Sequence, residues 1–201
     1  MKMDEPGRGK IDNFNKRSLY PLNREHLSKL KDWRNSQMDI LRQWKPLTDY
    51  NQEKWFQKIS EDNTQVIFAI LTPNEKGSNM DFIGYCGITY IDFRNRRGEI
   101  SFLVSPVRVQ DKKLYREDFL SVLYMLCQYG FEKLNLHKIF AETFAFREDH
   151  IKILEDFGFH LDGILRDHQF IKNQYQDSLF HSILYGEWLQ IKEKVKNVLE
   201  K

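Results

Sequence analysis

Three consecutive strand-like segments separated by short turns constrain this chain more than any other feature. They cover residues 65–71, 81–92 and 99–105, and the turns between them are "NEKGSN" and "FRNRRG". Runs rich in Val, Ile, Phe and Tyr bounded by Gly and Asn are typical of strands joined as hairpins. The sequence therefore predicts an antiparallel meander.

The segments around this meander predict helices and further strands. Helical spacing of apolar residues marks 20–36, with Asn23 as N-cap, and then 48–62, 116–136 and 147–159. Strands are expected at 137–144 and, as a pair around a turn, within 161–188. The predicted fold class is α/β, a mixed central sheet flanked by helices. We expect one domain over 17–188, a loosely ordered extension at 1–16 and a helical tail at 189–201.

Composition excludes several classes of function. Lys and Arg number 31 against 29 Asp and Glu, a net charge of +2, which gives no argument for binding DNA or a membrane surface. The sequence shows no bilayer-spanning apolar run and no signal-peptide pattern at its start, so the cytoplasm is the expected location. Cys86 and Cys127 lie in apolar runs and predict buried free thiols, and the six histidines show no metal-ligand spacing.

An ordered series of short motifs occupies the second half of the chain. They are Glu155–Phe159 "EDFGF", Gly163–Arg166 "GILR", Tyr175 with Asp177, and Ser182–Leu184 "SIL". In this order they resemble the GNAT superfamily of acetyl-CoA-dependent N-acetyltransferases, within the branch of ribosomal-protein and polyamine acetyltransferases. The resemblance spans about 19–188. It implies the GNAT fold, acetyl-CoA as cosubstrate, a primary amine as acceptor and no metal.

The first half is also similar to nucleotide-linked amino-sugar acetyltransferases, over a shorter stretch. The residues that carry this second resemblance are Trp33, Arg34, Asn35, Arg42, Trp55 and Phe56. It implies that Arg34 and Arg42 hold phosphates of the acceptor and that Trp33 stacks on it. Solvated arginines and a core tryptophan are the alternatives. The acceptor is then a nucleotide-linked amino sugar or, second, a protein N-terminus or polyamine.

Transfer to an amine needs a group that removes the amine's proton. Glu99 opens the strand at 99–105, where many relatives carry a glutamate near the acceptor, so it is the first candidate base. An ion pair with Arg96 or Arg97 is the alternative, and Asp92 is the second candidate.

The leaving thiolate needs a proton donor. Many family members place a tyrosine where this chain has Leu154. The remaining phenols are Tyr175, the first candidate, and Tyr115. For both, a packed aromatic ring is the alternative.

Acetyl-CoA has two expected contacts. Backbone groups of Phe102, Leu103 and Val104 would pair with the pantetheine arm and polarise the thioester carbonyl. The pyrophosphate would bind at the segment 105–118, before a helix N-terminus.

The segment 105–118 departs from the family, because its glycine positions are filled by other residues. The candidate phosphate ligands are Arg108, Lys112, Lys113 and Arg116, with Arg147 at the start of the short helix, where the family often has Asn. Glu117 and Asp118 are expected in the first helical turn, where they would repel a pyrophosphate.

Two functions follow. The first is an N-acetyltransferase acting on a small-molecule amine by direct attack in a ternary complex. The alternative is a degenerate GNAT-fold protein with weak or no CoA binding that serves as a ligand-binding or interaction module. The sequence leaves a homodimer open.

Overall fold

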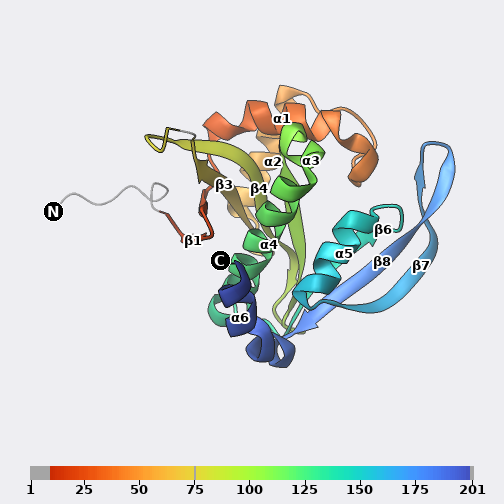
Figure 1. Ribbon diagram of the computed structural model, residues 1–201. Coiled ribbons are helices and arrows are strands. Elements are labelled where there is room, and N and C mark those ends of the chain that lie inside the picture. Colours follow the sequence, from red (N-terminus) through yellow and green to blue (C-terminus); the bar gives the residue numbers. More distant parts are fainter. Residues whose placement is uncertain (1–9, 75, 200–201) are drawn as a thin grey trace.

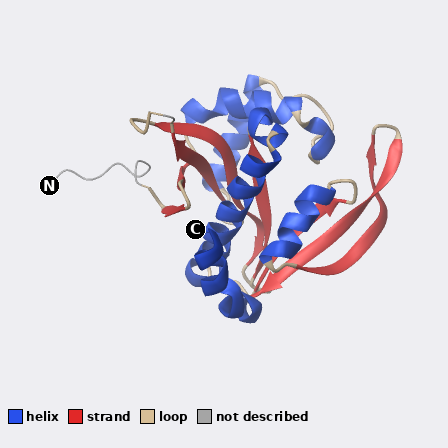
Figure 2. Cartoon of the chain, viewed as in Figure 1, coloured by secondary structure: helices blue, strands red, loops and turns tan. Residues whose placement is uncertain are grey.

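The computed structural model describes residues 10–74 and 76–199 and is built around one mixed sheet (Figures 1 and 2). Its eight strands lie in the order β1-β2-β3-β4-β5-β6-β8-β7. The strands are β1 Asp12–Phe14, β2 Arg17–Pro21, β3 Val66–Pro73, β4 Met80–Asp92, β5 Arg97–Val104, β6 Lys138–Phe144, β7 His160–Ile171 and β8 Gln174–Leu184. The α/β class with a mixed sheet is confirmed.

The predicted meander forms β3, β4 and β5, all antiparallel. At its edge the structure adds the hairpin β1–β2, whose turn residues Asn15 and Lys16 both have positive φ, as a tight two-residue turn requires. β1 lies within the segment 1–16, which the sequence predicts to be loosely ordered, so that part of the segment is a strand. Residues 1–9 lie outside the described residues. A three-residue strand is too short for an alternating pattern to be recognised in the sequence.

β5 and β6 are the only parallel neighbours among the described strands, and they separate early. Their register covers three pairs, Arg97–Lys138 to Glu99–Phe140, and ends there. β5 continues to Val104 on β4, whereas β6 continues to Phe144 on β8. The two central strands therefore diverge and leave an opening in the sheet beyond Glu99.

Helices cover both faces of the sheet (Figure 1). Their bounds are η1 Arg24–His26, α1 Leu27–Ser36, η2 Met38–Ile40, α2 Asp49–Glu61, α3 Pro106–Gln110, α4 Lys112–Gln128, the π-helical turn η3 Tyr129–Lys133, α5 Glu148–Phe157 and α6 Tyr185–Leu199. One core lies between the sheet and α4, α5 and α6, and a second lies under α1 and α2.

Local sequence explains where these helices begin and end. Asn23 and Thr48 each form a capping box with the residue three positions on, at η1 and α2. Gly158 ends α5 with a φ of +119°, which a residue with a side chain rarely adopts. The "GF" of the motif thus stops the helix and lets Phe159 turn into the core, where it is 2% exposed.

The C-terminal helix is joined to the core. Trp188 is fully buried, its ring lying 5.3 Å from that of Tyr124 and 6.3 Å from that of Phe157. The predicted division between domain and tail at residue 188 falls inside α6, and Ile191 and Val195 beyond it pack against the same core. No helix in the described ranges 10–74 and 76–199 has the length and apolarity needed to span a membrane.

The segment 105–118 is more regular than the sequence suggested. It forms α3 and the start of α4, with Asp111 between them as N-cap. Because α4 begins at Lys112, Glu117 and Asp118 lie in its second turn, and the expectation that they occupy the first turn is wrong. The spacing of apolar residues marks only the apolar part of this helix. It therefore predicts a start at 116, four residues after the true start that follows the N-cap Asp111.

Asp118 is instead a buried anchor between α4 and the β1–β2 hairpin. Its carboxylate has no exposed surface and accepts from Arg17 Nε at 2.8 Å and from Arg108 Nη2 at 2.7 Å. Arg17 is itself 4% exposed and also donates to Glu117 Oε2 at 3.1 Å. Removal of one partner from such a buried cluster leaves an uncompensated charge.

We therefore expect Asp118→Ala to lower the free energy of unfolding by about 3–5 kcal/mol. Urea denaturation followed by circular dichroism measures this loss. The matched control is Asp49→Ala, whose carboxylate pairs with Lys31 at 2.6 Å but is 84% exposed, and it should cost under about 1 kcal/mol. Equal losses in the two variants would contradict the assignment of Asp118 as an anchor.

Candidate active site

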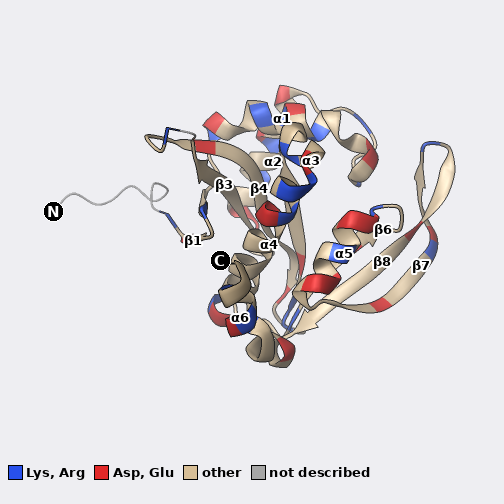
Figure 3. Ribbon diagram, in the orientation of Figure 1, with Lys and Arg blue, Asp and Glu red and all other residues tan. Residues whose placement is uncertain are grey.

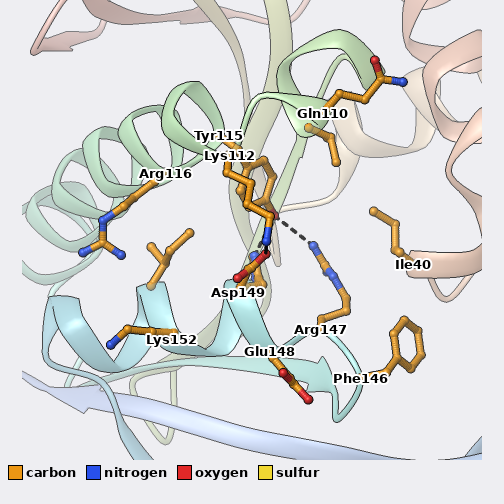
Figure 4. A pocket seen from close by; sticks show the side chains of 13 residues that line it. Ile40, Gln110, Lys112, Tyr115, Arg116, Phe146, Arg147, Glu148, Asp149 and Lys152 are labelled. Atoms are coloured by element: carbon orange, nitrogen blue, oxygen red, sulfur yellow. Dashed lines mark hydrogen bonds and ion pairs between the residues drawn. The ribbon is translucent and has the colours of Figure 1, made fainter.

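A pocket of about 560 Å³ lies between the start of α4 and the start of α5 (Figure 4). Its lining combines basic, acidic and aromatic side chains. They are Ile40, Val109, Gln110, Lys112, Tyr115, Arg116, Phe146, Arg147, Glu148, Asp149, His150, Lys152 and Ile153. We call it the outer pocket.

Three of the predicted phosphate ligands line the outer pocket: Lys112, Arg116 and Arg147. Lys112 Nζ lies 2.8 Å from Asp149, and Arg116 lies 2.9 Å from Asp156. Lys and Arg of α4 thus pair with Asp of α5 beside the pocket. Figure 3 shows the charged positions along the ribbons of α4 and α5. Both pairs are solvent-exposed, so a more highly charged anion can replace the carboxylates at little cost.

The other two predicted phosphate ligands lie elsewhere. Lys113 is absent from the described lining of the outer pocket. The Arg108 guanidinium is bound to buried Asp118 through Nε and Nη2. That pairing, together with Asp111, raises the pKa of Arg108. Arg108 therefore holds the fold together where the sequence suggested an anion contact.

The N-terminus of α4 has its own carboxylate. Asp111 Oδ1 accepts from the backbone N–H groups of Lys113 and Leu114, each at 3.0 Å. These are the donors that a bound anion would use at a helix N-terminus. An incoming phosphate must displace Asp111 or contact side chains beside it.

A second, smaller pocket of about 100 Å³ occupies the opening between β5 and β6. We call it the inner pocket. Phe102 lies in its wall, with its ring 4.6 Å from that of Phe119. The side chains of Leu103 and Val104 are buried, and the Val104 carbonyl accepts from Gln37 Nε2 at 3.0 Å. The predicted pantetheine strand thus borders the opening.

The inner pocket contains two carboxylates bridged by one arginine. Glu99 on β5 is 4% exposed and accepts a hydrogen bond from Arg42 Nη2. Arg42 Nη1 donates to Oε2 of Glu142 on β6 at 2.8 Å. Burial raises the pKa of Glu99, and the nearby charge of Glu142 adds to this effect, while Arg42 opposes it. Arg42 thus balances two carboxylates on the two sides of the opening.

Glu142 also keeps one acceptor free. Its Oε1 is buried and has no hydrogen-bond donor in the described part of the chain. His168 Nε2 lies 3.7 Å from this oxygen, beyond hydrogen-bonding distance. A buried carboxylate oxygen without a donor is costly unless a ligand supplies one. The opening is therefore built to receive a hydrogen-bond donor or a cation.

The predicted acceptor ligands are engaged within the protein. Arg42 bridges Glu99 and Glu142, and Arg34 lies over the Trp55 ring at 5.4 Å. Trp33 stacks on Phe82 at 5.2 Å and packs on the second core. For Trp33 this is the core-packing alternative of the sequence analysis.

The structure separates the candidate tyrosines. Tyr175 lies on the far part of the β7–β8 hairpin, is 65% exposed and is absent from the described lining of both pockets. Tyr115 is 9% exposed and lines the outer pocket, with its hydroxyl 2.7 Å from His150 Nδ1 and 2.9 Å from Arg147 Nη2. Asp92, the second candidate base, pairs with Asn95 at the hairpin turn, and these hydrogen bonds lower its pKa.

Two residues of the site were missed from the sequence. Glu142 is the only acidic residue in the apolar strand "KIFAETF", and a carboxylate at such a position is a usable signal. His150 sits one turn from Leu154 on the apolar face of α5, where it resembles an ordinary core residue. It lines both pockets, as Ile40 and Arg147 also do.

The two thiols are buried, as predicted. Cys86 and Cys127 have no exposed surface, and burial raises the pKa of both well above the ordinary range. Neither can supply a thiolate nucleophile near neutral pH. Residues 10–74 and 76–199 hold no cluster of His, Cys, Asp and Glu that could bind a metal ion.

Comparison with known proteins agrees with this geometry. The family described as "Acetyltransferase (GNAT) domain" matches residues 20–180. The chain is 31% identical to an uncharacterized N-acetyltransferase p20 of Bacillus licheniformis, over 54% of this chain and 58% of that protein. It is 25% identical to a spermidine N(1)-acetyltransferase of Vibrio cholerae, over 79% of this chain and 88% of that protein.

The fold agrees as well. A crystal structure of spermidine N-acetyltransferase from Vibrio cholerae in complex with CoA and spermine matches with a TM-score of 0.76 and 24% identity, covering 87% of this chain and 98% of that one. The family match extends over most of the chain and includes the strands that diverge and the helices that flank both pockets. The chain belongs to the GNAT acetyltransferase family, as an N-acetyltransferase that uses acetyl-CoA to acetylate a primary amine.

Proposed function

We propose that the acceptor is a small cationic amine of the polyamine class. The observation that carries this proposal is the buried pair Glu99 and Glu142, with the free Oε1 of Glu142. Two carboxylates in one small pocket attract a cation and disfavour an anionic substrate. The spermidine acetyltransferases among the relatives support this choice.

In the proposed complex the CoA pyrophosphate lies in the outer pocket, near Lys112, Arg116 and Arg147. The pantetheine arm follows β5 past Phe102 and places the thioester at the junction of the pockets. Glu99 takes the amine proton, directly or through a water, because it is the buried carboxylate nearest to the end of the β5–β6 pairing. Tyr175 is left out, since its side chain lies on the exposed hairpin.

A nucleotide-linked amino sugar is the second candidate acceptor. A groove beside Arg42 is lined by Trp44, which is 84% exposed, and by Phe170, which is 62% exposed. Exposed aromatic rings can stack on a base or a sugar. Against this candidate, Arg42 is neutralised by two carboxylates and has no charge to spare for a phosphate.

The homodimer stays a prediction. The edge strand β7 exposes Leu161, Ile164 and Leu165, which are 40–51% exposed. Exposed apolar residues on an edge strand, one side of which has no strand partner, favour self-association. A dodecameric structure of the Vibrio cholerae spermidine N-acetyltransferase is among the similar folds.

A double variant tests the CoA site. Lys112→Ala with Arg116→Ala should weaken CoA binding about tenfold, equivalent to about 1.4 kcal/mol, because two charge-assisted phosphate contacts are lost. Isothermal titration calorimetry with CoA measures the change. Lys113→Ala, which removes a neighbouring charge outside the pocket, should stay within about twofold. If Lys113→Ala weakened CoA binding as much as the double variant, the pyrophosphate would instead bind at the N-terminus of α4.

Glu142→Gln tests the acceptor class. The variant keeps the shape and removes one negative charge, so KM for spermidine should rise about tenfold or more, as expected for a lost partly buried charge contact. CoA affinity should not change. The readout is CoA release with a panel of spermidine, a nucleotide-linked amino sugar and an N-terminal peptide. Turnover of the amino sugar alone would replace the polyamine proposal with the second candidate.

Glu99→Gln tests the base. Since burial raises the pKa of Glu99, the wild-type kcat should fall with decreasing pH below a midpoint above the usual carboxyl value of about 4.3. At neutral pH the kcat of the variant should be about 10²–10⁴-fold lower, and it should no longer fall with decreasing pH in this range. If the variant kept the same fall of kcat at low pH, another group would be the base that takes the amine proton.

A further inference from the structure

The β7–β8 hairpin contains a bulge close to Glu142. The register pairs Leu165 with Ser178 and then Gln169 with Gln176, so residues 166–168 of β7 lie opposite Asp177 alone on β8. Extra residues on one strand interrupt the regular alternation and turn side chains in new directions. Such bulges are frequent beside active sites.

Asp177 holds this bulge in shape. Its Oδ1 accepts a hydrogen bond at 2.8 Å from the backbone N–H of Asp167, which has a φ of +51°. A positive φ is uncommon for a residue with a side chain, although aspartate adopts it more readily than most. The Asp177 carbonyl also accepts from the Ala145 N–H at 2.9 Å, just beyond the end of β6. Asp177 therefore joins the bulge to the strand that carries Glu142.

The bulge ends at His168, whose imidazole lies beside Glu142. His168 Nε2 is 3.7 Å from Glu142 Oε1, the buried oxygen that has no hydrogen-bond donor within 10–74 and 76–199. The His168 side chain is 41% exposed and that of Glu142 is 6% exposed, so the imidazole lies on the outer side of the carboxylate. A neutral imidazole has one ring nitrogen that accepts a hydrogen bond. Two acceptors thus lie side by side at the inner pocket.

The charges around these two acceptors favour a cation. Glu99, Glu142 and Arg42 together carry one net negative charge. Arg42 Nη1 occupies Glu142 Oε2 at 2.8 Å, which leaves Oε1 as the free oxygen of that carboxylate. A primary ammonium group has three N–H donors and no acceptor. It can therefore use both acceptors and keep one N–H for the base.

The gap between the two acceptors is close to the width that an ammonium group needs. Two acceptors that each lie about 2.8 Å from one tetrahedral nitrogen are about 4.6 Å apart. The observed 3.7 Å separation is shorter, and the imidazole must move outward by about 1 Å to admit the group. Its exposure leaves room for this movement, because rotamer changes of exposed side chains are fast.

We propose that His168 and Glu142 together bind the ammonium group of the acceptor amine, with Asp177 as the positioning residue that aims His168. This rests on the proposed cationic acceptor. The ammonium donates one N–H to Glu142 Oε1 and a second to His168 Nε2. The third N–H points to Glu99, which takes this proton directly or through a water. The resulting neutral amine is held by the same two acceptors when it attacks the thioester carbon.

His168→Ala tests the ammonium contact. The KM for spermidine should rise about tenfold, because one of two hydrogen bonds to a charged group is lost. The Kd for CoA should stay within about twofold, since His168 is absent from the described lining of the outer pocket. His168→Gln keeps a side-chain acceptor and should recover most of the loss. The matched control is His160→Ala on the same strand, whose 70% exposed imidazole lies 3.8 Å from Glu187, and it should keep the wild-type KM.

His168→Lys distinguishes an ammonium site from a simple effect on shape. The introduced side chain carries its own ammonium group, which Glu142 Oε1 can bind in place of the acceptor. The KM for spermidine should therefore rise further than in His168→Ala. If the two variants gave the same KM, the contact between His168 and the acceptor would be wrong.

Asp177 variants test the positioning role. Asp177→Ala should raise the KM for spermidine about as much as His168→Ala, whereas Asp177→Asn keeps an oxygen acceptor for the Asp167 N–H and should not. In the double variant His168→Ala with Asp177→Ala, the second change should add nothing to KM, because no imidazole remains to be aimed. Additive losses would mean that Asp177 supports the fold without acting through His168.

The outcomes separate this inference from the proposed function. If the wild-type protein acetylates spermidine and His168→Ala keeps its KM, the ammonium site is wrong and the polyamine acceptor stands. If the wild-type protein acetylates no amine of the panel, the proposed function fails and this inference fails with it.

Discussion

The early separation of β5 from β6 is the constraint on which the rest of this structure depends. Their parallel pairing ends at Glu99, after which β5 stays on β4 and β6 stays on β8. Backbone groups freed from a ladder must find other partners. In the proposed complex a pantetheine arm meets this need as an added strand does.

The two carboxylates at the opening would be costly to bury without a positively charged partner. Glu99 and Glu142 face the opening from the two diverging strands, and each would be expensive to bury alone. Arg42 reaches across from the loop after η2 and pairs with both, which leaves one negative charge among the three groups. Since η2 also carries Ile40, which lines both pockets, one short segment closes the inner pocket and borders the outer one. The same segment therefore lines both pockets and supplies the positive charge between the two carboxylates.

The sequence predicted the parts of this arrangement that rest on local patterns. The meander, the helix cap at Asn23, and the buried thiols all follow from periodicity and residue type. The identity of Glu99 as a site candidate came from a family pattern at a strand start, and the structure places it in the inner pocket. Pairings between distant residues could not be predicted. Arg42 meets residues 57 and 100 positions away, and Arg17 meets Asp118 across 101 positions.

The segment 105–118 shows why a missing motif is weak evidence against a function. Glycines allow a loop to point its N–H groups at a pyrophosphate. Here Pro106 starts a short helix in the same place, and Asp111 already satisfies two N–H groups of α4. The side chains of Lys112, at the first position of α4, and of Arg116, one turn further along, line the pocket instead and pair with Asp149 and Asp156 of α5. The basic residues of this segment therefore differ in their contacts: Arg108 anchors the fold through Asp118, whereas Lys112 and Arg116 line the outer pocket and pair with Asp149 and Asp156.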